Sequence, residues 1–262
     1  MGKIYPSLKE FLSLCQKGNL IPVCKEIAVG KETPVTAFQK ITAGKNKASE
    51  YAFLLESMEG GEKIGRYSIL GIANKAQVFT PKKINAVREL LRQYKFVALP
   101  DVPSFCGGLV GYVSYDAVRE IEKIPCKNPD TQKLPIMQFI LADNLIVFDH
   151  IEQKLFIIAN AHIRKNPKDA YQLACKKIAV LEKKLKNKLP ADPFKVESLP
   201  QTLSDFKSNL TRLEYETMVE KAKEYIRAGE IIQVVPSQRL QTPCTCPPFN
   251  LYRVLRVTNP SP

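Results

Sequence analysis

A stretch of linker composition at residues 187–208 is the feature that most constrains how this chain can fold. It holds three prolines, four serines or threonines and charges of both signs, which favours an extended connection over a packed element. It separates a first domain, residues 1–186, from a second segment, residues 209–262. The second segment has room for one helix, one strand and one further helix. Because a lone strand cannot satisfy its edges or bury both faces, we expect the second domain to be incomplete in this chain.

The composition is that of a folded, water-soluble protein. Hydrophobic residues make up 45% and charged residues 25%, which provides a sizeable core and argues against disorder as the main state. No apolar run approaches ~18 residues, and the first residues contain no signal-peptide core. We therefore expect no membrane-spanning segment and no signal peptide.

The basic balance of the chain does not indicate nucleic-acid binding. The net charge is +13, from 39 basic and 26 acidic residues. Lysines are scattered through nearly every segment, and the one dense run, 176–188, falls on the polar side of a predicted helix. A nucleic-acid binder concentrates its charge on one face, so we interpret these lysines as a solvated surface.

Cysteines and histidines give no clear catalytic or metal-binding pattern. Seven cysteines without a pairing framework indicate free thiols in a reducing compartment. Cys244 and Cys246 form the only close pair in the sequence, and with no second pair and no neighbouring histidine we expect no zinc site there. His150 and His162 have no nucleophile motif beside them and are interpreted as structural.

Hydrophobic periodicity predicts a mixture of helices and strands. Helices are expected behind the N-cap residues Ser7, Thr33, Asn166 and Thr211, and at 84–94 and 249–257. Strands are expected at 21–28, 51–57 (buried), 66–72, 76–79, 107–115, 136–148, 155–161 and 231–235, with 136–148 and 155–161 as one long hairpin. The predicted buried helix faces are Leu173, Ala174, Ile178, Leu181 and Leu185 in the fourth helix, and Tyr215, Met218, Val219, Ala222, Tyr225 and Ile226 in the fifth.

Five motifs follow one another in an informative order. They are LLES at 54–57 with GRYS at 65–68, GGLVGYVSYD at 107–116, a strand ending VFDH at 143–150, the segment 214–235, and LRVTNPSP at 255–262. Together they resemble component I of anthranilate synthase, a member of the chorismate-utilising enzymes, over about residues 7–262. The resemblance implies an α+β fold built on antiparallel sheets with packed helices.

The same resemblance implies a reaction and its participants. Component I converts chorismate and ammonia to anthranilate and pyruvate with magnesium, and a glutamine amidotransferase subunit, component II, supplies the ammonia. This implies a cytoplasmic lyase at the entry to tryptophan biosynthesis.

The family's chorismate- and magnesium-binding residues lie beyond the NPSP motif, so we assign no catalytic residue and no metal ligand to this chain. The 262 residues alone are accordingly expected to be inactive. Glu216 and Glu220, four apart on one helix face, are interpreted as surface charges that face Lys221 and Lys223 rather than as metal ligands.

The resemblance places the family's feedback-inhibitor site in this part of the chain. Ser57 of LLES would contact bound tryptophan, Arg66 of GRYS would border the pocket, and Pro262 would begin the segment that closes it. Ser57 can donate to a carboxylate, Arg66 carries positive charge, and Glu56 can accept from an ammonium group. The alternative is that Glu56, Ser57 and Arg66 only satisfy the ends of strands.

Other interpretations of the sequence remain open. Gly107, Gly108 and Gly111 fit neither a dinucleotide-binding fingerprint nor a P-loop, and are expected to permit close strand approach or a bulge. The alternative functions are aminodeoxychorismate synthase component I, which acts on the same substrate, and a non-catalytic remnant that is inert or only binds tryptophan.

Overall fold

The computed structural model describes residues 2–43, 51–56, 65–127, 129–189, 206–244 and 246–259. Their contacts divide these residues into two compact units, one before residue 190 and one from residue 206 to residue 259. Ser57 and Pro262 lie outside the described residues.

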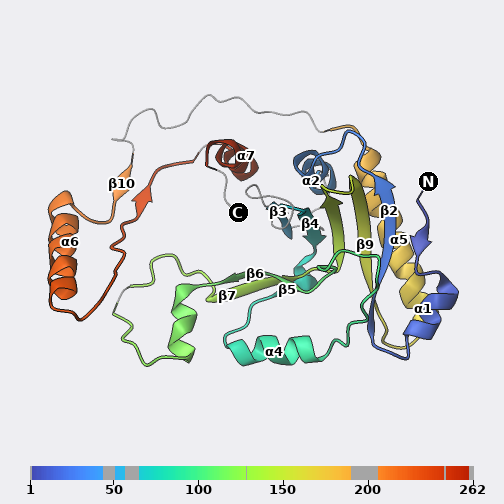
Figure 1. Ribbon diagram of the computed structural model, residues 1–262, viewed down its shortest axis with the longest axis horizontal. Coiled ribbons are helices and arrows are strands. Elements are labelled where there is room, and N and C mark those ends of the chain that lie inside the picture. The colour runs from blue at the N-terminus through green and yellow to red at the C-terminus, as the bar shows by residue number, and fades with distance from the viewer. Residues whose placement is uncertain are drawn as a thin grey trace. The chain divides into compact units, whose positions relative to one another are not determined.

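A six-stranded antiparallel sheet forms the centre of the first unit (Figure 1). Its spatial order is β1-β2-β9-β8-β4-β3. The two central strands, β8 and β9, are joined by a tight turn, and both are apolar over most of their length because both faces of the sheet are covered. The strand bounds are Ile4–Tyr5 (β1), Leu20–Ala28 (β2), Tyr51–Glu56 (β3), Tyr67–Ala73 (β4), Asn144–Asp149 (β8) and Lys154–His162 (β9).

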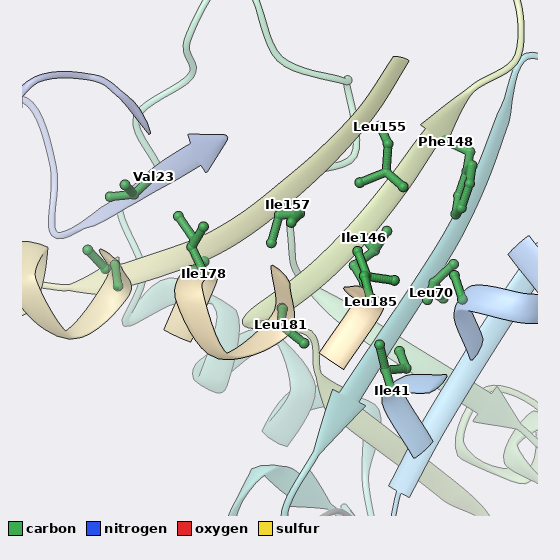
Figure 2. Packing of buried hydrophobic residues seen from close by; sticks show 14 of the residues in the cluster. Val23, Ile41, Leu70, Ile146, Phe148, Leu155, Ile157, Ile178, Leu181 and Leu185 are labelled. Carbon is green, nitrogen blue, oxygen red and sulfur yellow. The ribbon is translucent and has the colours of Figure 1, made fainter. Parts of the chain in front are cut away.

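Three helices cover one face of this sheet: α1 (Leu8–Leu14), α2 (Pro34–Thr42) and α5 (Pro167–Lys186). The predicted N-caps are confirmed, since Ser7, Thr33 and Asn166 each accept a hydrogen bond from a backbone N–H of the first turn. In Figure 2, Ile178, Leu181 and Leu185 of α5 lie against strand residues such as Ile146 and Ile157. The fully buried residues of this face include Phe11, Ile21, Val23, Ile41, Leu70, Leu155 and Ile157.

The predicted buried face of α5 needs one correction. Ala174, Ile178, Leu181 and Leu185 are buried as expected, but Leu173 is 55% exposed. The buried residues follow one stripe at intervals of three to four residues. Leu173 lies about 100° around the helix from Ala174 and therefore points away from the sheet.

The opposite face of the sheet carries a second, smaller core. It contains Cys24, Leu145, Val147, Phe156 and Ile158 from the strands, covered by residues of the 98–106 segment such as Val102 and Cys106. Strand β3 lies at the edge of the sheet, and its residues are mostly half-buried. The prediction of a strand at 51–57 is therefore confirmed over Tyr51–Glu56, but that of a fully buried strand is wrong.

A separate three-stranded sheet, of order β5-β7-β6, also belongs to the first unit. It consists of β5 (Val78–Phe79), β7 (Met137–Leu141) and β6 (Leu109–Val113), and the short helix η1 (Lys75–Gln77) precedes β5. Of the predicted strand at 76–79, only Val78 and Phe79 form a strand, because Ala76 and Gln77 belong to η1. Helix α4 (Ile84–Arg92) lies within the predicted 84–94, and η2 (Tyr115–Glu120) follows β6.

The prediction of one long strand at 136–148 is wrong, because β7 and β8 belong to different sheets. The chain changes partners at Ala142 and Asp143. The Ala142 N–H donates to the Gly108 carbonyl at 2.8 Å, whereas the Asn160 N–H donates to the Asp143 carbonyl at 2.8 Å. The buried Asp143 side chain also accepts from His162 and Gln77, which fixes the break.

The glycines of the 107–111 segment allow close backbone approach, as expected. A Cβ on Gly111 would lie 2.0 Å from the Gln138 carbonyl oxygen, across the β6–β7 ladder. A Cβ on Gly107 would lie 2.4 Å from Nδ2 of the Asn160 side chain. Gly107 and Gly108 also have positive φ angles of 155° and 131°.

The second unit contains two helices and a minimal ladder. These are α6 (Arg212–Arg227), α7 (Pro248–Thr258), and β10 (Lys207–Ser208) paired with β11 (Leu240–Gln241). The predicted strand at 231–235 is not formed. Its side chains Ile232 and Val235 are exposed, because the described residues of this unit offer that segment no partner strand.

Helix α6 confirms the predicted start but not the predicted burial. Thr211 and Glu214 form a capping box. Four residues of the predicted face are half-buried: Tyr215, Met218, Val219 and Ala222. No residue of the helix is fully buried, and Tyr225 and Ile226, which were also expected to be buried, are exposed. Among the described parts of the chain, no helix is long and apolar enough to cross a membrane.

Candidate functional site

Arg66 is the predicted site residue whose surroundings the structure defines best. It directly precedes β4, where Tyr67 pairs in register with Asp149, the last residue of β8. The Arg66 guanidinium donates to Asp149 Oδ2 from Nε at 3.0 Å and from Nη2 at 2.6 Å. Nη2 also lies 3.4 Å from Glu152 Oε1. The arginine is therefore held between the start of β4 and the β8–β9 turn.

Asp149 is the buried centre of this arrangement. Its second oxygen, Oδ1, accepts from the backbone N–H groups of Ile151 and Glu152, both at 3.1 Å, so the carboxylate also shapes the β8–β9 turn. Burial alone would raise the pKa of Asp149, but the hydrogen bonds from Arg66 and from these backbone groups outweigh it and lower the pKa. Asp149 is thus held as an anion, and its bond in turn raises the pKa of Arg66.

A cavity of about 930 Å³ opens beside this ion pair. It lies over the edge of the smaller core, and the whole of its lining comes from the first unit. The lining combines charged side chains with aromatic and apolar ones. Its residues are Tyr5, Pro6, Glu10, Ser13, Leu14, Glu26, Arg66, Tyr67, Leu99, Pro100, Asp101, Val102, Pro103, Asp149, Glu152, Lys154 and Phe156.

The cavity is acidic although the chain as a whole is basic. Its lining holds five carboxylates against two cations, Arg66 and Lys154. Lys154 lies between two of these carboxylates, with Nζ 2.9 Å from Glu152 and 3.5 Å from Glu26. The hydrogen bond to Glu152 raises the pKa of Lys154. Such a lining attracts an ammonium group to its carboxylates, and Arg66 and Lys154 are the two lining groups that can meet a carboxylate.

Two tyrosines give the cavity a partly apolar wall. The centre of the Arg66 guanidinium lies 5.0 Å from the centre of the Tyr67 ring, a distance typical of a cation–π contact. The Tyr5 hydroxyl donates to the Asp101 carbonyl at 3.0 Å. Burial raises the pKa of both phenols, so both remain neutral near pH 7. Together with Phe156, these rings can cover an apolar ligand surface.

Glu56 occupies a different position from Arg66. It pairs in register with Ser68 at the end of β3, on the side of the sheet that carries Leu54 and Leu70 and faces the helices. The Arg66 side chain instead reaches Asp149, next to Tyr67, on the side of the smaller core. The structure therefore brings Arg66 into the cavity but not Glu56. The predicted contacts of Ser57 and Pro262 concern positions outside the described residues.

Both histidines make specific side-chain contacts. His150 Nε2 lies 2.7 Å from the Ser68 hydroxyl, and His162 Nε2 lies 2.7 Å from Asp143 Oδ1. These contacts agree with the interpretation of both residues as structural. Glu220 pairs with Lys223, as expected of a surface charge, whereas Glu216 pairs with Arg212 rather than with Lys221.

Sequence reasoning missed Asp149, Tyr67 and Tyr5 as residues of this site. Asp149 stands in the VFDH motif and Tyr67 in GRYS, so a signal was present for both, but neither had a role assigned to it. Tyr5 and its partner Asp101 are 96 residues apart, and no local pattern connects them.

Comparison with known proteins supports the motif interpretation. A family model described as chorismate binding enzyme matches residues 50–262, a range that includes Arg66 and Asp149 as well as the second unit. Anthranilate synthase component 1 of Acetivibrio thermocellus is 36% identical, over 98% of this chain and 56% of its own length. The probable anthranilate synthase component 1 of Schizosaccharomyces pombe is 37% identical, over 99% and 53%.

A solved structure gives the same result for the fold. Anthranilate synthase component I from Streptococcus pneumoniae TIGR4 superimposes with a TM-score of 0.59 at 28% identity, over 90% of this chain and 53% of that one. The α+β architecture of antiparallel sheets with packed helices is thereby confirmed, and this chain spans about half the length of the relatives it matches. By its family match and its fold, the chain belongs to the chorismate-binding enzymes.

Proposed function

We propose that this chain is part of component I of an anthranilate synthase. In this reaction chorismate and ammonia give anthranilate and pyruvate, and component II, a glutamine amidotransferase, supplies the ammonia. The observation that carries the proposal is the similarity to enzymes of that name over almost the whole chain. We further propose a cytoplasmic location, in keeping with a biosynthetic enzyme. The relatives favour this function over the aminodeoxychorismate synthase alternative.

The 262 residues by themselves are proposed to lack activity. The relatives are about twice as long, and no catalytic residue is assigned within this chain. The test is an assay of the chain, purified from a host that lacks its own anthranilate synthase, with chorismate, ammonium and Mg²⁺. The fluorescence of anthranilate reports product. No product is expected. Measurable turnover, abolished when the chain is omitted, would show that the chemistry lies within these residues.

Magnesium is proposed as the cofactor of the complete enzyme. Mg²⁺ takes oxygen ligands in near-octahedral geometry, usually with one or two carboxylates and the substrate. Among the described residues, no group of three or more His, Cys, Asp or Glu side chains could hold a metal ion. The proposal therefore assigns no magnesium ligand to this chain.

We also propose that the cavity beside Arg66 belongs to the tryptophan feedback site. Tryptophan presents a carboxylate, an ammonium group and an aromatic ring. The bonds from Arg66 to Asp149 and Glu152 use Nε and Nη2, so Nη1 can still donate to a ligand carboxylate. Carboxylates such as Glu26 and Glu152 can accept from the ammonium group, and Tyr67 and Phe156 can pack on the ring. Ser57 and Pro262 are proposed as further contacts, whereas Glu56, on the helix-covered side of the sheet, is not proposed as an acceptor in this cavity.

Substitutions in the complete enzyme test this assignment. Ser57→Phe would place a ring in ligand volume and remove a donor, and Arg66→Gln would remove the charge. Each should weaken tryptophan inhibition by about tenfold to a hundredfold, because one hydrogen bond in a buried site is worth about 1–3 kcal/mol, while turnover without tryptophan stays intact. Arg88→Gln on α4, outside the cavity lining, is the matched control.

Direct binding gives a second readout. The 262-residue chain should bind tryptophan weakly or not at all in a calorimetric titration, because the segment beginning at Pro262 is proposed to close the pocket. Tight binding by this chain would show that the first unit alone makes the site. Unchanged inhibition of both Ser57→Phe and Arg66→Gln enzymes would remove these residues from it.

A further inference from the structure

Two thiols meet in the second unit, just before helix α7. The Sγ atoms of Cys244 and Cys246 lie 3.6 Å apart, and all seven cysteines are free. Cys244 is exposed and Cys246 is half-buried. The backbone continues from Cys246 into Pro247 and Pro248, whose fixed φ angles hold this side of the pair at the start of the helix.

The other cysteines differ from this pair in exposure and surroundings. Cys24 and Cys106 are buried in the smaller core, where burial raises the pKa of both thiols, that of Cys106 to about 11. Cys15 and Cys175 are half-buried against the helix-covered core. Cys126 is exposed but lies in another segment. Cys244 and Cys246 are therefore the pair of thiols that solvent species can reach together.

The two thiols are in contact, and their sulfurs are spaced nearly as in a two-thiolate chelate. In a tetrahedral zinc thiolate, Zn–S bonds of about 2.3 Å place two sulfurs about 3.8 Å apart. The observed 3.6 Å is close to that edge, and a metal ion could bind with little rearrangement.

We propose that Cys244 and Cys246 form an exposed two-thiolate site for a soft divalent cation of the zinc class, such as Zn²⁺ or Cd²⁺. It is an open site, and it differs from the closed zinc site with four protein ligands that the lack of a second cysteine pair and of a neighbouring histidine argues against. The described residues supply no third side chain for such a cluster, so water or a small anion completes the coordination. Two protons leave as the metal binds, one from each thiol, and no oxidant or reductant takes part.

Titration of the reduced 262-residue chain with Cd²⁺ tests the site, because cadmium–thiolate bonds give a charge-transfer band in the ultraviolet. One Cd²⁺ per chain is expected. Cys244→Ser and Cys246→Ser should each weaken binding by roughly 10²–10⁴-fold, since each breaks the chelate. Cys126→Ser, at the other exposed cysteine, should leave the affinity unchanged.

Three results would contradict the proposed metal site. Equal Cd²⁺ binding by the wild-type chain and the Cys244→Ser variant would overturn the proposal, as would loss of binding in Cys126→Ser. Absence of the charge-transfer band in a chain whose seven thiols all titrate as reduced in denaturant would also overturn it. Competition between Zn²⁺ and Cd²⁺ for one site should follow the same dependence on the two cysteines.

Discussion

The two units use the same local devices but reach different degrees of burial. Helix α1 in the first unit and α6 in the second both begin with a capping box, and both present one apolar face. In the first unit, α1 buries Phe11 completely and α5 buries four residues against the sheet. In the second unit, α6 buries none.

This difference shows which part of helix formation is local. A cap, a good propensity and a periodic pattern determine where a helix begins and which side is apolar. Burial requires a partner surface, and in the first unit the six-stranded sheet provides it. An isolated helix of this length is marginal in water, so α6 should be the less stable element.

The largest expected effect is a matched pair of isoleucine substitutions. Ile178 on α5 is 1% exposed and Ile226 on α6 is 43% exposed. Ile178→Ala should lower the free energy of unfolding of the first unit by about 2–5 kcal/mol, because it leaves a cavity in the core. Ile226→Ala should change stability by no more than about 0.5 kcal/mol. Urea unfolding followed by circular dichroism would measure both, and equal losses would contradict the difference between the units.

A second test compares two glycines. Gly111→Ala would place a Cβ 2.0 Å from the Gln138 carbonyl oxygen and force β6 away from β7, at a cost of about 1–3 kcal/mol. Gly229 follows α6 with a φ of 77° and has open space around it. Gly229→Ala should therefore cost only the backbone strain, about 1 kcal/mol, and affect α6 alone. Thermal unfolding of both variants separates the two causes, and an unaffected Gly111→Ala protein would refute the close approach.

The Asp149–Arg66 pair should contribute a pH-dependent part of the stability of the first unit. The pKa of Asp149 is lowered in the folded state, so its contribution is fully present well above the unfolded pKa of about 3.9. The contribution is lost as the pH falls through the folded value. Asp149→Asn should destabilise by about 1.5–3 kcal/mol at pH 7 and by less at an acid pH below about 3.9, where the contribution declines.

Asp116 provides the control for that measurement. Its carboxylate pairs with Arg119, but its side chain is largely exposed. Asp116→Asn should change the free energy of unfolding by less than about 1 kcal/mol at either pH. If the loss for Asp149→Asn were as small, or did not depend on pH, Asp149 would not be the buried anion described here.

The smallest expected effects come from the two capping boxes. Ser7→Ala and Thr211→Ala each remove an N-cap worth about 1 kcal/mol. In α1, Phe11 and the sheet should hold the helix, so only its first turn should exchange amide hydrogens faster. In α6, the whole helix should exchange several-fold faster. A rise confined to the first turn of α6 would indicate that tertiary contacts stabilise that helix as well.

The sequence predicted most elements of this fold because their signals are local. Ser7, Thr33, Asn166 and Thr211 begin helices as their side chains indicated, and the apolar runs of β2 and β9 form strands. The failures concern partners. The break between β7 and β8 depends on the contacts of Asp143 with His162 and Gln77. The absence of a strand at 231–235 reflects the lack of a neighbouring strand among the residues that the structure describes.

In the candidate site, too, a local motif predicted one residue, whereas its partner could not be predicted. Arg66 could be chosen from its motif, but its partner Asp149 is 83 residues away, and nothing in the sequence joins them. The direction of the Arg66 side chain, toward the smaller core and away from the face of Glu56, depends on that ion pair. Residue types and strand alternation alone could not reveal it.

Hydrogen exchange of the 262-residue monomer, followed by mass spectrometry, tests the central claim most directly. The claim is that the first unit is a complete core whereas α6 has a helical pattern without a full partner surface. Amides of β8 and β9 should exchange only through global unfolding, and those of Arg212–Arg227 should exchange faster by several orders of magnitude. Uniformly high protection through both regions of a monomer would contradict this account.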